Sequence, residues 1–134
     1  MAAEHDVQVE GELGAKPVVS LPGGEPPAGL ITEDLTVGEG AEAGPNARVD
    51  AHYVGVGWTS GRQFDASWDR GAPITFPLSG VIRGWSEGIP GMRVGGRRLL
   101  VIPGDLAYGR RPPPGAGIAP DETLVFVVDL VDVT

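Results

Sequence analysis

The sequence predicts one compact α+β domain in which a sheet of mainly antiparallel strands packs on a single short helix. Strand-like alternation of apolar and polar residues recurs from residue 30 onward, whereas residues 83–90 form the only good helix candidate. A parallel sheet would need more crossover helices than this. The chain of 134 residues has room for one domain and a tail, and 41% of its residues are hydrophobic, which is enough for a core. Its 22 glycines and 13 prolines supply the turns.

Residues 1–29 differ in composition from the rest of the chain. They contain five acidic residues, one lysine (Lys16) and no aromatic residue, and four prolines interrupt any regular structure. We therefore expect an acidic, Pro/Gly-rich N-terminal tail that is largely extended or disordered, well ordered only near residue 30 if at all. Residues 7–9 and 18–19 could pair briefly at an edge. The folded domain is expected over residues 30–134.

Six segments of this domain have strand-like patterns. The second segment places Val49, Ala51 and Tyr53 on one face by period two. Pro77, in the fourth segment, lacks a backbone donor and therefore suggests an edge strand or a bulge. In chain order, the strands are expected over residues 30–37, 48–56, 63–67, 74–78, 96–103 and 123–133.

The helix candidate is barely two turns long. Trp85 and Ile89 fall at positions i and i+4, and Pro90 with Gly91 is a plausible stop. A long Pro- and Gly-rich loop is expected over residues 104–121, ahead of the final strand. Its three consecutive prolines are expected to be a rigid loop segment, with a polyproline ligand for a partner as the alternative.

Composition excludes several classes of function. The formal net charge is −8, so the chain repels phosphate, and we expect neither nucleic acid nor an anionic membrane as a partner. Because there is no cysteine and only two histidines, disulfides, thiolate zinc sites, cysteine nucleophiles and multi-histidine metal sites are excluded. The longest apolar run, residues 124–128, is far too short to span a bilayer. The N-terminus has no basic segment followed by an apolar stretch, so a cytoplasmic location is expected by default.

Three apparent catalytic motifs fail on their context. Residues 84–88 read G-x-S-x-G, but a nucleophile elbow needs a histidine later in the chain, and the last one is His52. The glycines of residues 55–61 have the wrong spacing for a dinucleotide fingerprint, and no helix follows them. Asp65 and Asp69 form a carboxylate pair of the kind that glycosidases use, but those enzymes need a broad cleft that so small a domain could hardly supply.

Seven other stretches occur in the order, and near the spacings, of a known enzyme family. They read HYVG (52–55), GRQFDAS (61–67), VIRGW (81–85), GIPGMRVG (88–95), IP (102–103), AYG (107–109) and TLVF (123–126). On these residues, the chain from Leu30 to its C-terminus closely resembles the FKBP-type peptidyl-prolyl isomerases. The resemblance implies a twisted antiparallel sheet curled around the short helix, with a shallow apolar pocket between them.

The resemblance also implies which residues form the pocket and what they do. Trp85 would be the floor. The backbone N–H of Ile82 and the hydroxyl of Tyr108 would hold substrate carbonyls. Asp65, oriented by neighbouring side chains, would lie beside the twisting carbonyl as an electrostatic group rather than a proton donor. The substrate-binding residues carried over are Tyr53, Phe64, Asp65, Arg70, Val81, Ile82, Trp85, Tyr108, Ile118 and Phe126, of which Asp65, Tyr108 and Ile82 are the catalytic ones.

These residue types suit the isomerisation of an X-Pro bond. Rotation about a peptide bond costs about 18–20 kcal/mol because resonance must be broken. Because no bond is made, no nucleophile, metal or cofactor is required, and we expect none. An aromatic pocket strips water from the amide, and the planar amide loses more by this than the less polar twisted one. Preferential binding of the twisted state then accelerates the rotation.

The family resemblance also implies the partners. We expect proline-containing peptides and unfolded proteins as substrates, tacrolimus and rapamycin as ligands, and a monomeric chain. The alternative is a non-catalytic binding module for proline-containing segments or macrolides. It is motivated by the pocket rim at residues 78–81, which is about two residues shorter than usual in the family. Ile74 stands where some members carry a phenylalanine, and the loop over residues 110–120 also departs from the family's sequence.

Overall fold

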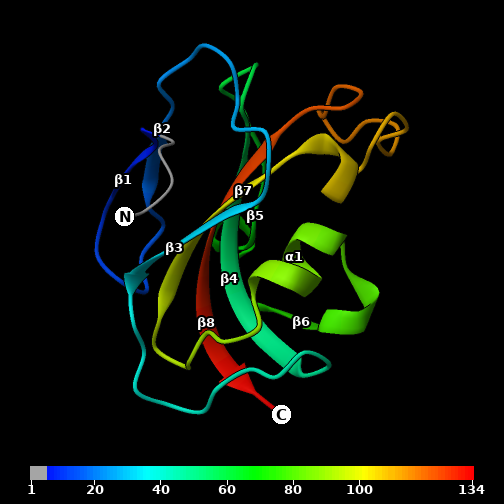
Figure 1. Cartoon of the computed structure of the whole chain (residues 1–134). Helices are drawn as coiled ribbons and strands as arrows, with labels where there is room; N and C mark the ends of the chain where they lie inside the picture. The colour runs from blue at the N-terminus through cyan, green and yellow to red at the C-terminus, as the bar shows by residue number, and fades with distance from the viewer. Residues whose placement is uncertain (1–5) are drawn as a thin grey trace.

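The computed structural model describes residues 6–134 and is built on a six-stranded sheet (Figure 1). The strand order is β3-β7-β8-β4-β5, with β6 paired to β4 outside this path, and every pairing is antiparallel. This architecture confirms the α+β class. The strands of the sheet are β3 (Ile31–Thr36), β4 (Arg48–Gly57), β5 (Gln63–Ala66), β6 (Ile74–Pro77), β7 (Arg97–Ile102) and β8 (Leu124–Val133).

Helix α1 (Arg83–Gly88), the one α-helix within residues 6–134, packs on one face of this sheet (Figure 1). It approaches closely because Gly84 has no side chain: a Cβ there would lie only 2.4 Å from a side-chain carbon of Ile102. The helix ends two residues earlier than residues 83–90 predict, although the Ile89 amide still donates to the Trp85 carbonyl. The stop at Pro90 is therefore confirmed, with Ile89 as the C-cap.

Strand β4 changes partner along its length, and this opens the sheet beside Tyr53. Its first half pairs with β6 and its second half with β5. Between the two, the side chain of Ser67 takes the place of a strand, because its Oγ accepts from the Tyr53 amide at 2.7 Å and donates to the Tyr53 carbonyl. Ser67 begins the 3₁₀ turn η1 (Ser67–Arg70), which carries the chain from β5 towards β6. Pro77 ends β6 at an edge, as predicted.

Both faces of the sheet are buried, which explains the continuous apolar runs of β7 and β8. The inner face, towards α1, carries Tyr53, Leu100 and Phe126 within the main core. The outer face carries a second cluster, which we call the outer cluster. It consists of Val7, Val54, Val56, Trp58, Ala66, Leu99, Val101, Val125 and Val127.

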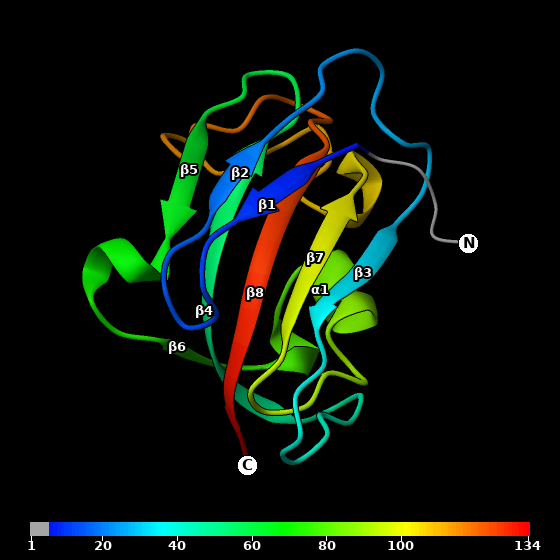
Figure 2. The same ribbon diagram turned by 90° about the vertical axis from the view of Figure 1, so that its left-hand side faces the viewer.

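The N-terminal segment covers the outer cluster (Figure 2). Strands β1 (Gln8–Glu10) and β2 (Val18–Ser20) form a two-stranded antiparallel hairpin, so the suggested pairing of these residues is confirmed. Val7 is 6% exposed within the cluster, and Val9 and Val19 pack against it. Residues 6–29 thus differ from the largely extended or disordered tail that we expected, and residues 1–5 of that tail lie outside the described residues.

The physical reason for this correction lies in the sheet rather than in the tail. Four apolar residues of β7 and β8 lie on the outer face, and leaving a valine or leucine side chain exposed there would forgo about 1.5–3 kcal/mol. They are Leu99, Val101, Val125 and Val127. The few apolar residues of the N-terminal segment meet this requirement, while its prolines and glycines lie outside its two strands. The composition of this segment indicates disorder because composition does not show that the segment can pack on the outer face of the sheet.

Candidate functional site

A cavity of about 520 Å³ lies between α1 and the inner face of the sheet. Residues from β4, β5, β6, β8 and α1 and from the loop after β7 line it, so segments far apart in the sequence converge there. Most of the lining side chains are apolar or aromatic. They are Tyr53, Phe64, Asp65, Ile74, Phe76, Gly80, Val81, Ile82, Trp85, Tyr108 and Phe126.

Trp85 is the centre of the aromatic packing around this cavity. Its ring stands edge-on to Tyr53 and to Phe126, with centroids 5.0 and 5.1 Å away, and Phe76 lies at 4.9 Å. The side chain is 7% exposed, and its indole nitrogen has no hydrogen-bond partner among residues 6–134. Edge-on aromatic pairs hold their rings in defined orientations. The cavity therefore has a rigid apolar floor.

Gly55 on β4 allows two rings of the wall to approach the sheet. A Cβ at this position would lie 2.5 Å from Phe64 and 2.7 Å from Phe126. These two rings meet edge-on, with centroids 5.5 Å apart. The register places Gly55 opposite both Asp65 on β5 and Phe126 on β8. Because Gly55 has no side chain, the charged and the apolar sides of the cavity can lie close to each other.

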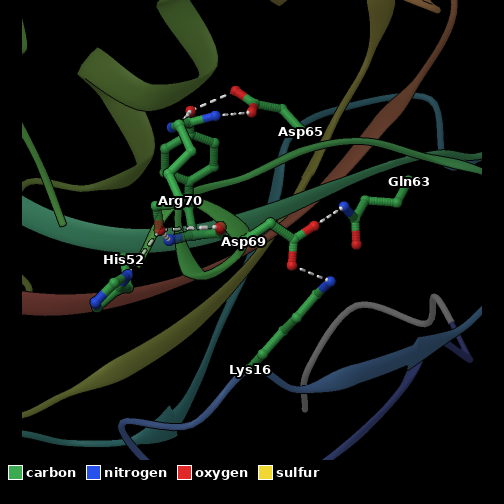
Figure 3. A network of polar contacts seen from close by, with 8 residues as sticks. Lys16, His52, Gln63, Asp65, Asp69 and Arg70 are labelled. Carbon is green, nitrogen blue, oxygen red and sulfur yellow. Dashed lines mark hydrogen bonds and ion pairs between the residues drawn. The ribbon is translucent and has the colours of Figure 1, made fainter. Parts of the chain in front are cut away.

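One polar cluster stands at the edge of the apolar cavity (Figure 3). The Tyr53 hydroxyl donates to one carboxylate oxygen of Asp65, and the Arg70 guanidinium donates to the other at 2.6 Å. Arg70 also donates to the Tyr53 hydroxyl at 3.0 Å. The three side chains therefore form a closed triangle of hydrogen bonds, which we call the Asp65 triangle.

The triangle fixes the charge of its members. Burial by itself would raise the pKa of the Asp65 carboxyl, but the hydrogen bonds from Tyr53 and Arg70 outweigh it and hold that pKa below its ordinary value. Burial, followed by the hydrogen bond to Asp65, raises the pKa of Tyr53 to about 12. At neutral pH the cavity thus presents a carboxylate beside a neutral phenol.

Within residues 6–134 there is no group of three His, Cys, Asp or Glu side chains that could hold a metal ion. In the same part of the chain, no helix is long and apolar enough to cross a membrane.

An apolar aromatic cavity with one oriented carboxylate is what the family resemblance implies, and the family comparison decides the assignment. Residues 39–131 match the family model described as FKBP-type peptidyl-prolyl cis-trans isomerase. The chain belongs to this family. It is therefore assigned to the enzymes that interconvert the cis and trans forms of peptidyl-prolyl bonds.

Individual members of the FKBP family resemble the chain over most of its length. The FK506-binding protein of Streptomyces anulatus is 54% identical over 120 residues, which cover 88% of this chain and 97% of that protein. The peptidyl-prolyl cis-trans isomerase FPR2 of Saccharomyces cerevisiae is 50% identical over 94 residues, 69% of either chain. The crystal structure of AtFKBP13 aligns with a TM-score of 0.71 at 39% identity, covering 81% of this chain and 95% of that one.

Eight of the ten site residues that the family resemblance implies line the cavity, which we call the FKBP pocket. Tyr53, Phe64, Asp65, Val81, Ile82, Trp85, Tyr108 and Phe126 all line it. Arg70 stands behind the lining and reaches the pocket through Asp65. Ile118 is partly buried against the main core but is not part of the lining, so its contact with substrate stays a prediction.

Two of the three proposed catalytic groups have an environment that suits a substrate carbonyl. The Ile82 carbonyl accepts from the Trp85 and Ser86 amides, which starts the helix, while the Ile82 N–H has no partner within residues 6–134. Tyr108 is 38% exposed, and burial, with a smaller effect from the charge of Asp65, raises the pKa of its hydroxyl.

Sequence reasoning missed Phe76 and Gly80 as parts of the FKBP pocket. Phe76 could have been found by period two, because it lies on the same face of β6 as Ile74, which was recognised as a wall position. Gly80 ends the short 3₁₀ turn η2 (Leu78–Gly80) on the shortened rim. This rim still reaches the cavity through Gly80 and Val81.

Proposed function

We propose that this chain accelerates X-Pro rotation by binding the twisted amide in the cavity above Trp85. The observation that carries the proposal is the Asp65 triangle standing at the edge of an aromatic floor. The proline ring occupies the apolar part of the cavity, and the preceding carbonyl turns beside Asp65. Removing water from the amide disfavours its planar, more polar form, so the barrier of about 18–20 kcal/mol falls.

The polar groups orient the substrate and hold charge. The Asp65 carboxylate keeps a fixed negative charge next to the rotating amide, because Tyr53 and Arg70 stabilise its ionised form. The Ile82 N–H and the Tyr108 hydroxyl each donate to a substrate carbonyl. Each thousandfold acceleration requires only about 4 kcal/mol of preferential binding, which a few such contacts can supply.

An isomerisation assay on short X-Pro peptides tests this proposal. Trp85→Leu removes the floor and Asp65→Ala removes the charge, so both variants should lose most of the activity of the intact chain. Arg93→Met, which removes an exposed ion pair with Glu42, is the control and should keep it. No acceleration by the intact chain would contradict the proposal. Peptide binding without acceleration would instead select the non-catalytic binding module.

We also propose that the pocket binds tacrolimus and rapamycin. Relatives with 54% identity are named FK506-binding proteins, and the cavity offers the apolar lining that a macrolide requires. A ligand that binds only the folded chain raises its melting temperature. We therefore expect each macrolide to raise the melting temperature of the wild type but not of Trp85→Leu. An unchanged wild-type value would contradict this proposal.

We further propose that the chain is a cytoplasmic monomer acting on unfolded proteins. The exposed large apolar side chains, such as Val18, Val37 and Val131, come from different elements of the fold, and a chain without cysteine needs no oxidising compartment. Light scattering should give the mass of one chain at micromolar concentration, and fractionation should recover the protein with the cytosol. The mass of a dimer would contradict the monomeric state, and recovery in another fraction would contradict the cytoplasmic location.

A further inference from the structure

The loop between β1 and β2 rests on a polar row that crosses the outer face of the sheet. The Arg97 guanidinium and the Asp129 carboxylate lie opposite each other on β7 and β8 and form an ion pair at 2.6 Å, with 3% and 6% of their side chains exposed. The loop caps this pair directly. The Gly14 amide donates to Asp129 at 2.8 Å, and Arg97 donates to the Ala15 carbonyl at 2.7 Å.

The same loop reaches η1, the turn that carries Arg70. Lys16 Nζ lies 2.7 Å from Oδ1 of Asp69, and the Gln63 amide donates to the other oxygen at 2.7 Å (Figure 3). The Trp68 indole N–H donates to the Gly14 carbonyl at 3.1 Å.

Other contacts hold η1 at Ser67, at Trp68, where the Arg97 guanidinium lies 5.9 Å from the ring centroid, and at Arg70 itself. The turn is four residues long, and its N-cap residue makes no side-chain capping hydrogen bond. Ser67 is anchored to the Tyr53 backbone, and the Trp68 ring stacks on His52 with centroids 4.9 Å apart. Short 3₁₀ turns have poorer hydrogen-bond geometry than α-helices, so their end residues depend on side-chain contacts. Within residues 6–134, the Asp69 carboxylate, directly before Arg70, accepts side-chain hydrogen bonds from Lys16 and Gln63.

We propose that Lys16 is a positioning residue for the isomerase site: by holding Asp69, it fixes η1 so that Arg70 is presented to Asp65 and Tyr53. The inference rests on the role proposed above for the Asp65 triangle. It gives the N-terminal segment a function in catalysis, although none of residues 6–29 lines the cavity. Lys16 is the only lysine of the chain and is 37% exposed in the ion pair.

The test compares Lys16→Met with Arg93→Met in the full chain. Both changes remove one exposed ion pair of similar accessibility, and Arg93→Met also removes a hydrogen bond to the Gly40 carbonyl, but only the Lys16 pair contacts η1. We expect Lys16→Met to lower kcat/KM by about two- to fivefold, the range that an exposed pair can supply. The melting temperature should change equally little in both variants, and Lys16→Arg should restore kcat/KM. The loss should shrink as salt screens the pair in the wild type.

A double-mutant cycle shows whether Lys16 acts through Arg70. On the background of Arg70→Met, the change Lys16→Met should cause no further loss. In the NMR spectrum, Lys16→Met should shift the amide signals of Asp65 and Arg70, and Arg93→Met should leave them in place.

Three outcomes would overturn the inference. If Lys16→Met keeps the full kcat/KM while Arg70→Met loses it, the role of Lys16 is overturned and the role of the triangle stands. The same holds if Lys16→Met lowers kcat/KM equally in the wild type and in Arg70→Met. An Arg70→Met variant with full activity would overturn the proposed role of the triangle and this inference with it. Asp65→Ala and Trp85→Leu then report separately on whether the cavity is the site of isomerisation.

Discussion

At the scale of residues, the proposed catalysis depends on the negative charge that the Asp65 carboxylate keeps. Its two oxygens accept from different donors, a phenol and a guanidinium, and these donors are also hydrogen-bonded to each other. Charge-assisted hydrogen bonds of this kind favour the ionised carboxylate. The group therefore acts as a fixed charge during the rotation of the amide, and it does not exchange a proton with the substrate.

This fixed charge predicts a flat pH profile. The pKa of Asp65 lies below its ordinary value and that of Tyr53 is about 12, so neither group titrates between about pH 5 and pH 8. The Asp65 carboxylate contributes fully to the free energy of unfolding at pH values above its pKa in the unfolded chain. This contribution is lost as the pH falls through its lower pKa in the folded chain. Isomerase assays across that range should give a constant kcat/KM. A bell-shaped profile centred near neutrality would indicate proton transfer and contradict the proposed role.

At the scale of elements, the cavity exists because α1 lies close against β7 and because one edge of β4 has no strand partner at Tyr53, between β6 and β5. The first condition depends on Gly84 and the second on Ser67, which replaces a strand by a single hydroxyl. The N-terminal hairpin adds a third element on the outer face. Each of these arrangements can be tested by a single substitution.

Gly84→Ala should weaken the packing of α1 on the sheet. Alanine gains about 1 kcal/mol in helix propensity, but its Cβ would meet Ile102, which is fully buried, at 2.4 Å. Overpacking of this kind costs about 1–3 kcal/mol, so the net effect should be a loss of stability together with activity. Urea denaturation measures it, with Ser86→Ala on the same helix as the control. A Gly84→Ala variant as stable as Ser86→Ala would contradict the close approach.

Arg97→Met should destabilise the chain strongly. It leaves the Asp129 carboxylate buried without its ion-pair partner, which typically costs about 3–5 kcal/mol. Arg83→Met removes an exposed pair with Glu87 on α1 and should cost at most about 0.5 kcal/mol. Urea denaturation of both variants gives the comparison. Equal, small losses would show that the N-terminal loop does not enclose the Arg97–Asp129 pair.

At the scale of the whole molecule, the sequence predicted the sheet, the helix and most of the pocket, but not the covering of the outer face. Alternation and the family stretches located β4, β7 and β8, and with them Tyr53 and Phe126. The docking of Val7 was missed because the prolines and glycines of residues 1–29 dominate its local signal. The unbroken apolar run at 124–128 held the missing information, since it implies a sheet covered on both sides. The position of Ile118 relative to the cavity could not be predicted from the sequence, because Ile118 lies in a loop whose conformation depends on tertiary contacts.

The most direct test of the central claim is NMR exchange spectroscopy on a short X-Pro peptide with a catalytic amount of the full chain. We expect exchange cross-peaks between the cis and trans forms. Saturating peptide should also shift the NMR signals of the Trp85 indole and the Ile82 amide, while signals of the outer cluster stay in place. A peptide that exchanges no faster than it does alone, or that shifts the outer cluster instead, would contradict the claim that the cavity above Trp85 is the site of isomerisation.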